Sequence, residues 1–246
     1  MVTSHTRIIM GMPITLQLPG TTPLSVIESA FNRFIEIDSQ YSPYIPSSEV
    51  SNIGSGAVAL ADASEELHSI LDLAQDAKTK TNLYFDPFHK EVFDPSGIVK
   101  GWAIAEVVAI LRQAGIEYFI VDAGGDMYCA GKNESNVPWK IGIRAPLEPS
   151  KVVKQLALSN MAIATSGTSE RGQHIYNPKT DEPIVDLLSV SVIGLDIIWA
   201  DVYATAAFAM GRAGIEWLEM MPDYEGFAIL PDMTGISTSG MARFLA

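Results

Sequence analysis

The sequence contains very little cysteine and no long hydrophobic segment. Cys129 is the single cysteine among 246 residues, so no intrachain disulfide can form and stability must come from packing. No stretch reaches the roughly 18 apolar residues that a membrane-spanning helix requires. The N-terminus has neither a signal-peptide hydrophobic region nor a cysteine for lipid attachment. We therefore expect a cytoplasmic protein without a transmembrane segment, in which Cys129 is a buried structural thiol.

Basic residues are also scarce. The chain has 16 Lys and Arg residues against 29 Asp and Glu residues, a formal net charge of −13. This balance argues against a nucleic-acid partner or an anionic membrane surface, because both require basic patches. It still allows one local cationic pocket for a phosphate. Apolar residues make up 48% of the chain, enough for a substantial core.

Hydrophobic periodicity predicts a single α+β domain of mixed sheets and helices, and a division of this domain into two lobes is compatible with the pattern. The chain shows no internal repeat and no linker. Helices are expected at 23–38, after the cap Ser64, from Ile98 to just before Gly115, at 200–210 and at 215–221. Strands are expected at 8–18, 117–123, 127–130, 139–144, 162–166, 187–194, 227–230 and 235–238, and a long loop at 39–57.

One loop carries several residues suited to anion binding. Asp94, Gly97 and Lys100 lie in the stretch D-P-S-G-I-V-K-G-W-A, directly before a helix-like pattern. The N–H groups and dipole at a helix N-terminus favour an anion such as phosphate. Many glycine-bearing loops precede helices for turn reasons alone, so this loop needs partners elsewhere in the chain.

Asp201 and Thr205 form a second candidate pair. Their spacing of four places both oxygen side chains on one face of a helix. Apolar neighbours suggest partial burial, and a buried carboxylate needs a partner such as magnesium. The alternative makes Asp201 a helix N-cap and Thr205 a hydroxyl bonded to a backbone carbonyl.

Other candidates also have structural alternatives. His174 lies in a polar turn between strands and is either a general base or a hydrogen-bonded structural residue. Tyr44, Tyr84 and Phe85 could stack on a planar ring, or pack together in a small loop core. Gly124 and Gly125, before Asp126, could approach a ligand or simply form a tight turn.

Taken in order, these segments resemble the ApbE family, the FAD:protein FMN transferases, over nearly the whole chain. Met10-Gly11-Met12 is similar to the family's N-terminal Met-Gly-Thr strand, and 41–52 to its S-x-Y-x-P-x-S-E loop. Five further segments match family motifs in chain order. Residues 81–88 match T-D-G-x-F-D-P-T, residues 94–103 match D-L-G-G-I-A-K-G-Y-A, and residues 121–126 match N-x-G-G-D. Residues 165–183 match T-S-G…H-I-I-D-P-x-T-G-x-P, and residues 191–211 match S-V-x-V…A-D-x-x-A-T-A.

The resemblance implies a magnesium-dependent transfer of FMN from FAD to a Ser or Thr hydroxyl of an acceptor flavoprotein, with release of AMP. It implies metal binding by Gly97, Asp201 and Thr205, and catalytic roles for His174 and Lys100. It also implies FAD contacts, which we expect from Met10, Tyr44, Tyr84, Phe85, Asp86, Asp94, Lys100 and His174. Family members are often periplasmic membrane-anchored lipoproteins.

The chain departs from the family pattern around the expected flavin ring. Family members usually carry some dozens more residues between F-D-P-T and the lysine loop, whereas here Phe85 and Asp94 are nearly adjacent. Leu83 and Tyr84 replace D-G, and Asp181 replaces the glycine of D-P-x-T-G. An abbreviated lid would also suit two alternatives: an FAD pyrophosphatase that yields FMN and AMP, or a non-catalytic FAD-binding module.

Overall fold

The protein is built around one large antiparallel sheet. The structure is a computed structural model that describes residues 1–88, 94–168 and 175–246. Neighbouring strands of the sheet pair antiparallel in the order β1-β2-β3-β4-β7-β10-β11-β12. These strands are β1 (Val2–Ile9), β2 (Met12–Pro19), β3 (Phe119–Ala123), β4 (Asp126–Ala130), β7 (Met161–Gly167), β10 (Ser189–Gly194), β11 (Glu225–Ile229) and β12 (Gly235–Ser237).

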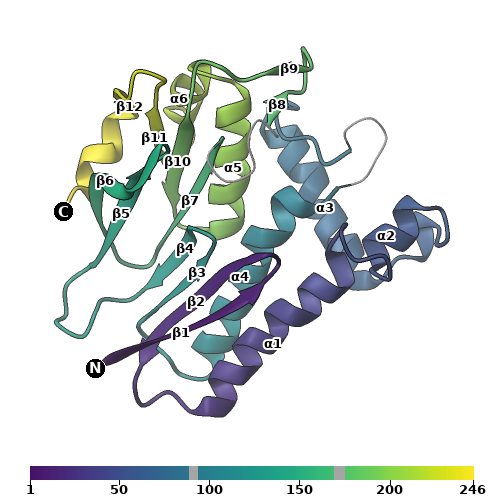
Figure 1. The fold of residues 1–246 in the computed structure, drawn as a ribbon, viewed down its shortest axis with the longest axis horizontal. Coiled ribbons are helices and arrows are strands. Elements are labelled where there is room, and N and C mark those ends of the chain that lie inside the picture. Colours follow the sequence, from purple (N-terminus) through teal and green to yellow (C-terminus); the bar gives the residue numbers. More distant parts are fainter. Residues whose placement is uncertain (89–93, 169–174) are drawn as a thin grey trace.

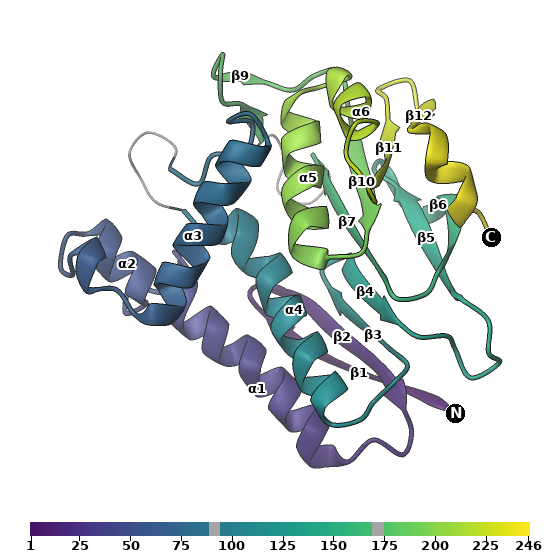
Figure 2. The same ribbon diagram turned by 180° about the vertical axis from the view of Figure 1, so that it is seen from behind.

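Helices cover one face of this sheet (Figures 1 and 2). In the view of Figure 2, α1, α4 and α5 cross the near face, while α2 and α3 extend from them away from the sheet. Within the described residues, no helix is long and apolar enough to cross a membrane. The helices are α1 (Leu24–Tyr41), α2 (Glu49–Gly54), α3 (Glu65–Lys80), α4 (Ser96–Gln113), α5 (Ile197–Ala209) and α6 (Ala213–Leu218), with 3₁₀ turns at Leu60–Asp62 and Ser239–Phe244.

The opposite face of the sheet is covered by a separate hairpin, β5 (Trp139–Ala145) and β6 (Glu148–Leu158). Alternation along β3 divides the core between the two faces: Phe119 and Val121 join the cluster under the helices, and Ile120 joins the cluster under β5 and β6. Cys129 belongs to the second cluster and is fully buried. Burial raises the pKa of its thiol to about 12, as expected for a structural cysteine. The α+β prediction is confirmed.

Two of the predicted segments were wrong in detail, and one strand was missed. The single strand at 8–18 is a hairpin, because Met10 and Gly11 both adopt positive φ (55° and 71°) and form a two-residue turn. The alternation of apolar residues continues through both strands, so the sequence pattern does not indicate the turn between them. The loop at 39–57 contains α2, which is capped by Ser48. Strand β6 was not predicted because its first half is exposed and polar.

Helices α4 and α5 are in close contact at Gly101. A Cβ atom at this position would lie 3.1 Å from both the Ile197 carbonyl oxygen and the Ile198 Cα, and 3.2 Å from the Asp201 Cβ. Backbone atoms cannot move aside as a flexible side chain can, so the contact requires a residue without a side chain. Gly101 therefore sets the separation of the two helices.

Gly101→Val should lower the free energy of unfolding by about 1–3 kcal/mol, the usual cost of overpacking a core. Gly54→Val is the matched control, since Gly54 also lies in a helix and a Cβ atom added there would have no neighbouring atom within 4 Å. Urea unfolding followed by circular dichroism would measure both variants. Equal stabilities for the two would contradict the close contact between α4 and α5.

Candidate active site

The site residues implied by the sequence converge on one large cavity of about 1030 Å³. It opens where the loops after α1 and α3, the start of α4, the β3–β4 turn and the end of β7 meet. Every described residue of the implied set lines it: Met10, Tyr44, Tyr84, Phe85, Asp86, Asp94, Gly97, Lys100, Asp201 and Thr205. His174 lies outside the described residues, so its predicted place in the site stays a prediction.

A charged cluster lies at the base of this cavity. Lys100 Nζ, from the second turn of α4, is 2.5 Å from Asp126 Oδ2 and 3.7 Å from Asp201 Oδ1. Asp201 Oδ2 accepts a hydrogen bond from the Gly101 N–H at 3.2 Å. Asp126 Oδ1 accepts one from the Thr165 N–H at 2.8 Å. Four elements, α4, β4, β7 and α5, are thus joined through two carboxylates and one ammonium.

Both carboxylates are buried, and they share this one lysine. Burial raises the pKa of Asp201 to about 7; Lys100 opposes the shift, and the charge of Asp126 adds to it. A buried carboxylate that lacks sufficient positive charge nearby favours its protonated form. A hard divalent cation would restore the balance, because Mg²⁺ binds one or two protein carboxylates and completes its shell with waters and phosphate oxygens. The cluster therefore fits the implied metal.

Asp201 is not the N-cap of its helix. Helix α5 begins three residues earlier than predicted, and Asp196 caps it by accepting the Ile198 and Trp199 N–H groups. Asp201 therefore lies in the helix interior, and Thr205 follows one turn later on the same face. The Thr205 Oγ1 and Ser166 Oγ atoms are 3.0 Å apart and hydrogen-bonded. The N-cap alternative for Asp201 was wrong.

The aromatic residues near the cavity divide into two groups. Phe85 is buried, and its ring lies against Gly97, where a Cβ would come within 3.0 Å of the ring. Tyr44 is 78% exposed, and Lys179 Nζ lies 4.0 Å from the centre of the Tyr84 ring. Packing in a small loop core thus describes Phe85, whereas Tyr44 lines the cavity and is largely exposed to solvent.

Polar residues at this end of the cavity are held by local contacts. The Met10 N–H donates to Asp38 Oδ2 at 3.2 Å, so the β1–β2 turn is fastened to α1. Asp86 pairs with Lys78 at 3.0 Å, and Asp94 Oδ1 accepts the Ser96 N–H at the start of α4. These contacts fix the loops that precede and follow the undescribed segment 89–93.

Sequence reasoning missed one member of the buried charged cluster, Asp126, and several residues that line the cavity. Asp126 was considered only as part of a glycine turn, although the N-x-G-G-D match ends on it. Asp38 and Tyr176 line the cavity, but isolated positions in a helix and a short strand carried no signal. Tyr176 belongs to a small hairpin formed by β8 (Tyr176–Asn177) and β9 (Glu182–Pro183). Ser166 falls within a matched motif, and only its contact with Thr205 shows its position.

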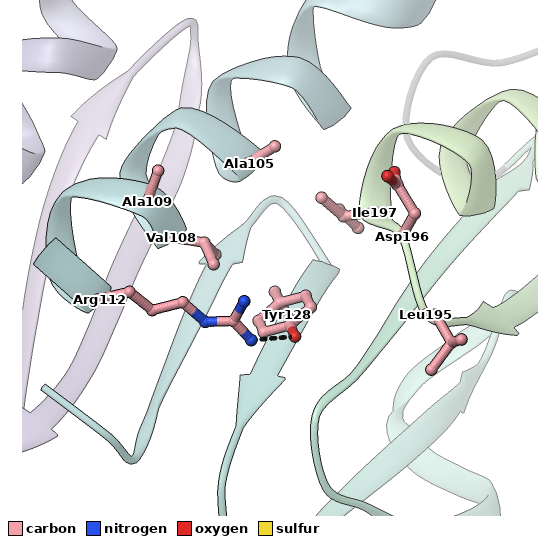
Figure 3. Close-up of a pocket in the computed structure, with 8 residues that line it drawn as sticks. All are labelled: Ala105, Val108, Ala109, Arg112, Tyr128, Leu195, Asp196 and Ile197. Atoms are coloured by element: carbon pink, nitrogen blue, oxygen red, sulfur yellow. Dashed lines mark hydrogen bonds between the residues drawn. The ribbon is translucent and has the colours of Figure 1, made fainter.

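A second, smaller pocket of about 230 Å³ contains none of the predicted residues. Figure 3 shows it between α4, β4 and the start of α5, with Arg112 donating a hydrogen bond to the Tyr128 hydroxyl at 2.6 Å. Its α4 side is formed by Ala105, Val108 and Ala109. The chemistry implied by the sequence therefore belongs to the larger cavity.

Comparison with known proteins finds curated relatives that carry the same name. Curated relatives named FAD:protein FMN transferase include one from Vibrio cholerae, 35% identical over 129 residues (48% of this chain, 39% of the relative). Another, from Salmonella typhimurium, is 28% identical over 153 residues (54% and 44%). The matched segments thus span less than half the length of these relatives.

Solved structures share the fold over the full chain. The ApbE protein from Thermotoga maritima matches with a TM-score of 0.88 at 21% identity, covering 100% of both chains. The flavin transferase ApbE from Vibrio cholerae matches with a TM-score of 0.84 at 22% identity, covering 100% of this chain and 99% of the other. The ApbE family model matches residues 10–94 and 89–228, which is most of the sequence. This chain belongs to the ApbE family.

Proposed function

We propose that the protein transfers FMN from FAD to a Ser or Thr hydroxyl of an acceptor flavoprotein, in a magnesium-dependent reaction that releases AMP. One observation carries this proposal: every described residue that the family resemblance implies lines the same cavity. Two of these, Lys100 and Asp201, also meet in a buried charged cluster. The names of the curated relatives support the same activity.

The chemistry is a phosphoryl-group exchange. The acceptor oxygen forms a bond to the FMN phosphorus, the bond from that phosphorus to the oxygen bridging to AMP breaks, and AMP leaves. His174 would take the proton of the attacking hydroxyl, since a histidine titrates near neutral pH. Lys100 would offset negative charge on the pyrophosphate oxygens.

The residues that would hold the metal are the side chains of Asp201 and Thr205 and the carbonyl of Gly97. Magnesium would supply positive charge beside the pyrophosphate. The buried carboxylates of Asp126 and Asp201 support this metal assignment, because the two share the single ammonium of Lys100. Asp126 would hold Lys100 in place and so orient its ammonium toward the substrate.

Incubation with FAD, Mg²⁺ and a candidate acceptor should give a flavin-fluorescent acceptor band on a denaturing gel, together with AMP in equal amount. The covalent phosphodiester explains why the fluorescence survives denaturation. FMN and AMP formed without an acceptor would instead indicate a pyrophosphatase. FAD that binds and stays intact would indicate a binding module, and either result would contradict transfer.

Asp201→Asn should reduce magnesium-dependent turnover by roughly 100-fold or more, because it removes the buried charge proposed to hold the metal. The fold should persist, since an asparagine oxygen can still accept the Gly101 N–H. Asp72→Asn is the charge-matched control on the exposed surface of α3. Steady-state rates and melting temperatures would be measured for both, and unchanged turnover in Asp201→Asn would remove the metal assignment.

His174→Ala should slow transfer by roughly 100-fold or more, the range of general-base catalysis, with little change in FAD affinity. Rates with saturating FAD would be compared with FAD dissociation constants from calorimetry. Equal losses in rate and affinity would show that His174 only binds the substrate.

A further inference from the structure

The large cavity has an unbalanced set of charges. Among the described residues that line it, five are carboxylates and two are cations: Asp38, Asp86, Asp94, Asp122 and Asp201, with Lys100 and Arg144. The first cation is already engaged, because Lys100 lies between Asp126 and Asp201. An anionic ligand with two phosphates needs further positive charge.

Arg144 is the cation that remains. Its side chain makes no hydrogen bond or ion pair with another described residue, and the residue is exposed on β5. Its neighbours Ile143 and Ala145 are buried against the sheet. Alternation along β5 thus puts Arg144 on the exposed face of the strand, and because Arg144 also lines the cavity, it can meet a ligand there without losing a partner.

The backbone at Arg144 is irregular. Ile143 pairs with Lys154 and Arg144 with Val152, and the register of β5 and β6 shifts on both sides of Arg144. Bulges of this kind occur often beside active sites, where they redirect a side chain or end a pairing. Gly142, on the same face, also lines the cavity, and the Val152 side chain of β6 lies over it, where a Cβ atom at Gly142 would come within 2.9 Å of a Val152 methyl carbon.

Three groups of lining residues come from different parts of the fold, and in Figure 1 the helices α2 and α3 and the strand β5 lie on opposite sides of α4 and α5. Tyr44 and Tyr84 lie on the loops after α1 and α3, Lys100 and Asp201 lie at the charged cluster, and Arg144 lies on β5. FAD has a matching order of parts: flavin ring, pyrophosphate and adenosine. With the ring at the aromatic loops and the pyrophosphate at the cluster, the adenylate half extends toward β5.

We propose that Arg144 binds the adenylate half of FAD, an inference that rests on the proposed function. A planar guanidinium suits this ligand because it can pair with phosphate oxygens in a bidentate manner and stack on a flat ring. Arg144 thereby makes the site specific for the dinucleotide over FMN, since FMN lacks the part that it contacts.

Isothermal titration calorimetry with FAD, FMN and ADP, each with Mg²⁺, tests this directly. Arg144→Gln should weaken FAD and ADP binding by about tenfold or more, as expected for loss of a charge-assisted contact, and leave FMN binding unchanged. Arg144→Lys should recover part of the loss, because it keeps the charge without the planar group. Lys140→Gln is the matched control: Lys140 lies on the same exposed face of β5 but outside the cavity.

Unchanged ADP and FAD affinities in Arg144→Gln would overturn the inference, as would an equal loss for FMN. A loss of the same size in Lys140→Gln would also overturn the inference, because the loss of affinity would then come from removing any nearby positive charge and not from a contact made by Arg144. The transfer assay separates the two proposals. If Arg144→Gln transfers FMN normally and binds FAD and ADP as the wild type does, only the role of Arg144 is rejected. If the wild type transfers no FMN but Arg144→Gln selectively loses ADP binding, only the proposed activity is rejected.

Discussion

The structure depends on the close contact of α4 and α5 at Gly101. Because this residue has no side chain, the backbone of α5 comes near enough for Asp201 to accept the Gly101 N–H. The same contact places Asp201 beside Lys100, and Lys100 reaches Asp126 on β4. One helix crossing therefore determines the geometry of the buried charges, and these charges form the base of the cavity.

The sequence predicted the pattern of helices and strands well wherever a clear period was present. The cap at Ser64, the Gly124–Gly125 turn between β3 and β4 and the C-terminal strand pair are all found. The sequence-based prediction failed where no residue pattern indicated that a strand ends or begins. Met10 enters a left-handed turn that methionine rarely adopts, and the first half of β6 lacks a buried face.

The candidate site was predictable only through the order of its motifs. Spacing alone left Asp201 and Thr205 with two explanations, and the N-cap at Asp196 excludes only the one in which Asp201 caps the helix. Asp126 could not be assigned from spacing, because its importance comes from Lys100, which lies far from it in sequence. Arg144 lay outside the quoted motifs, and only the cavity and the bulge mark it.

The hydrogen bond between Gly101 and Asp201 joins residues 100 positions apart. Contacts of such long sequence separation form late, because the intervening chain must first lose much of its freedom. During synthesis, α4 leaves the ribosome well before α5 exists, so Lys100 initially lacks one of its two carboxylate neighbours. A nascent chain thus cannot assemble the charged cluster, and the cavity acquires its base only after most of the large sheet has been made.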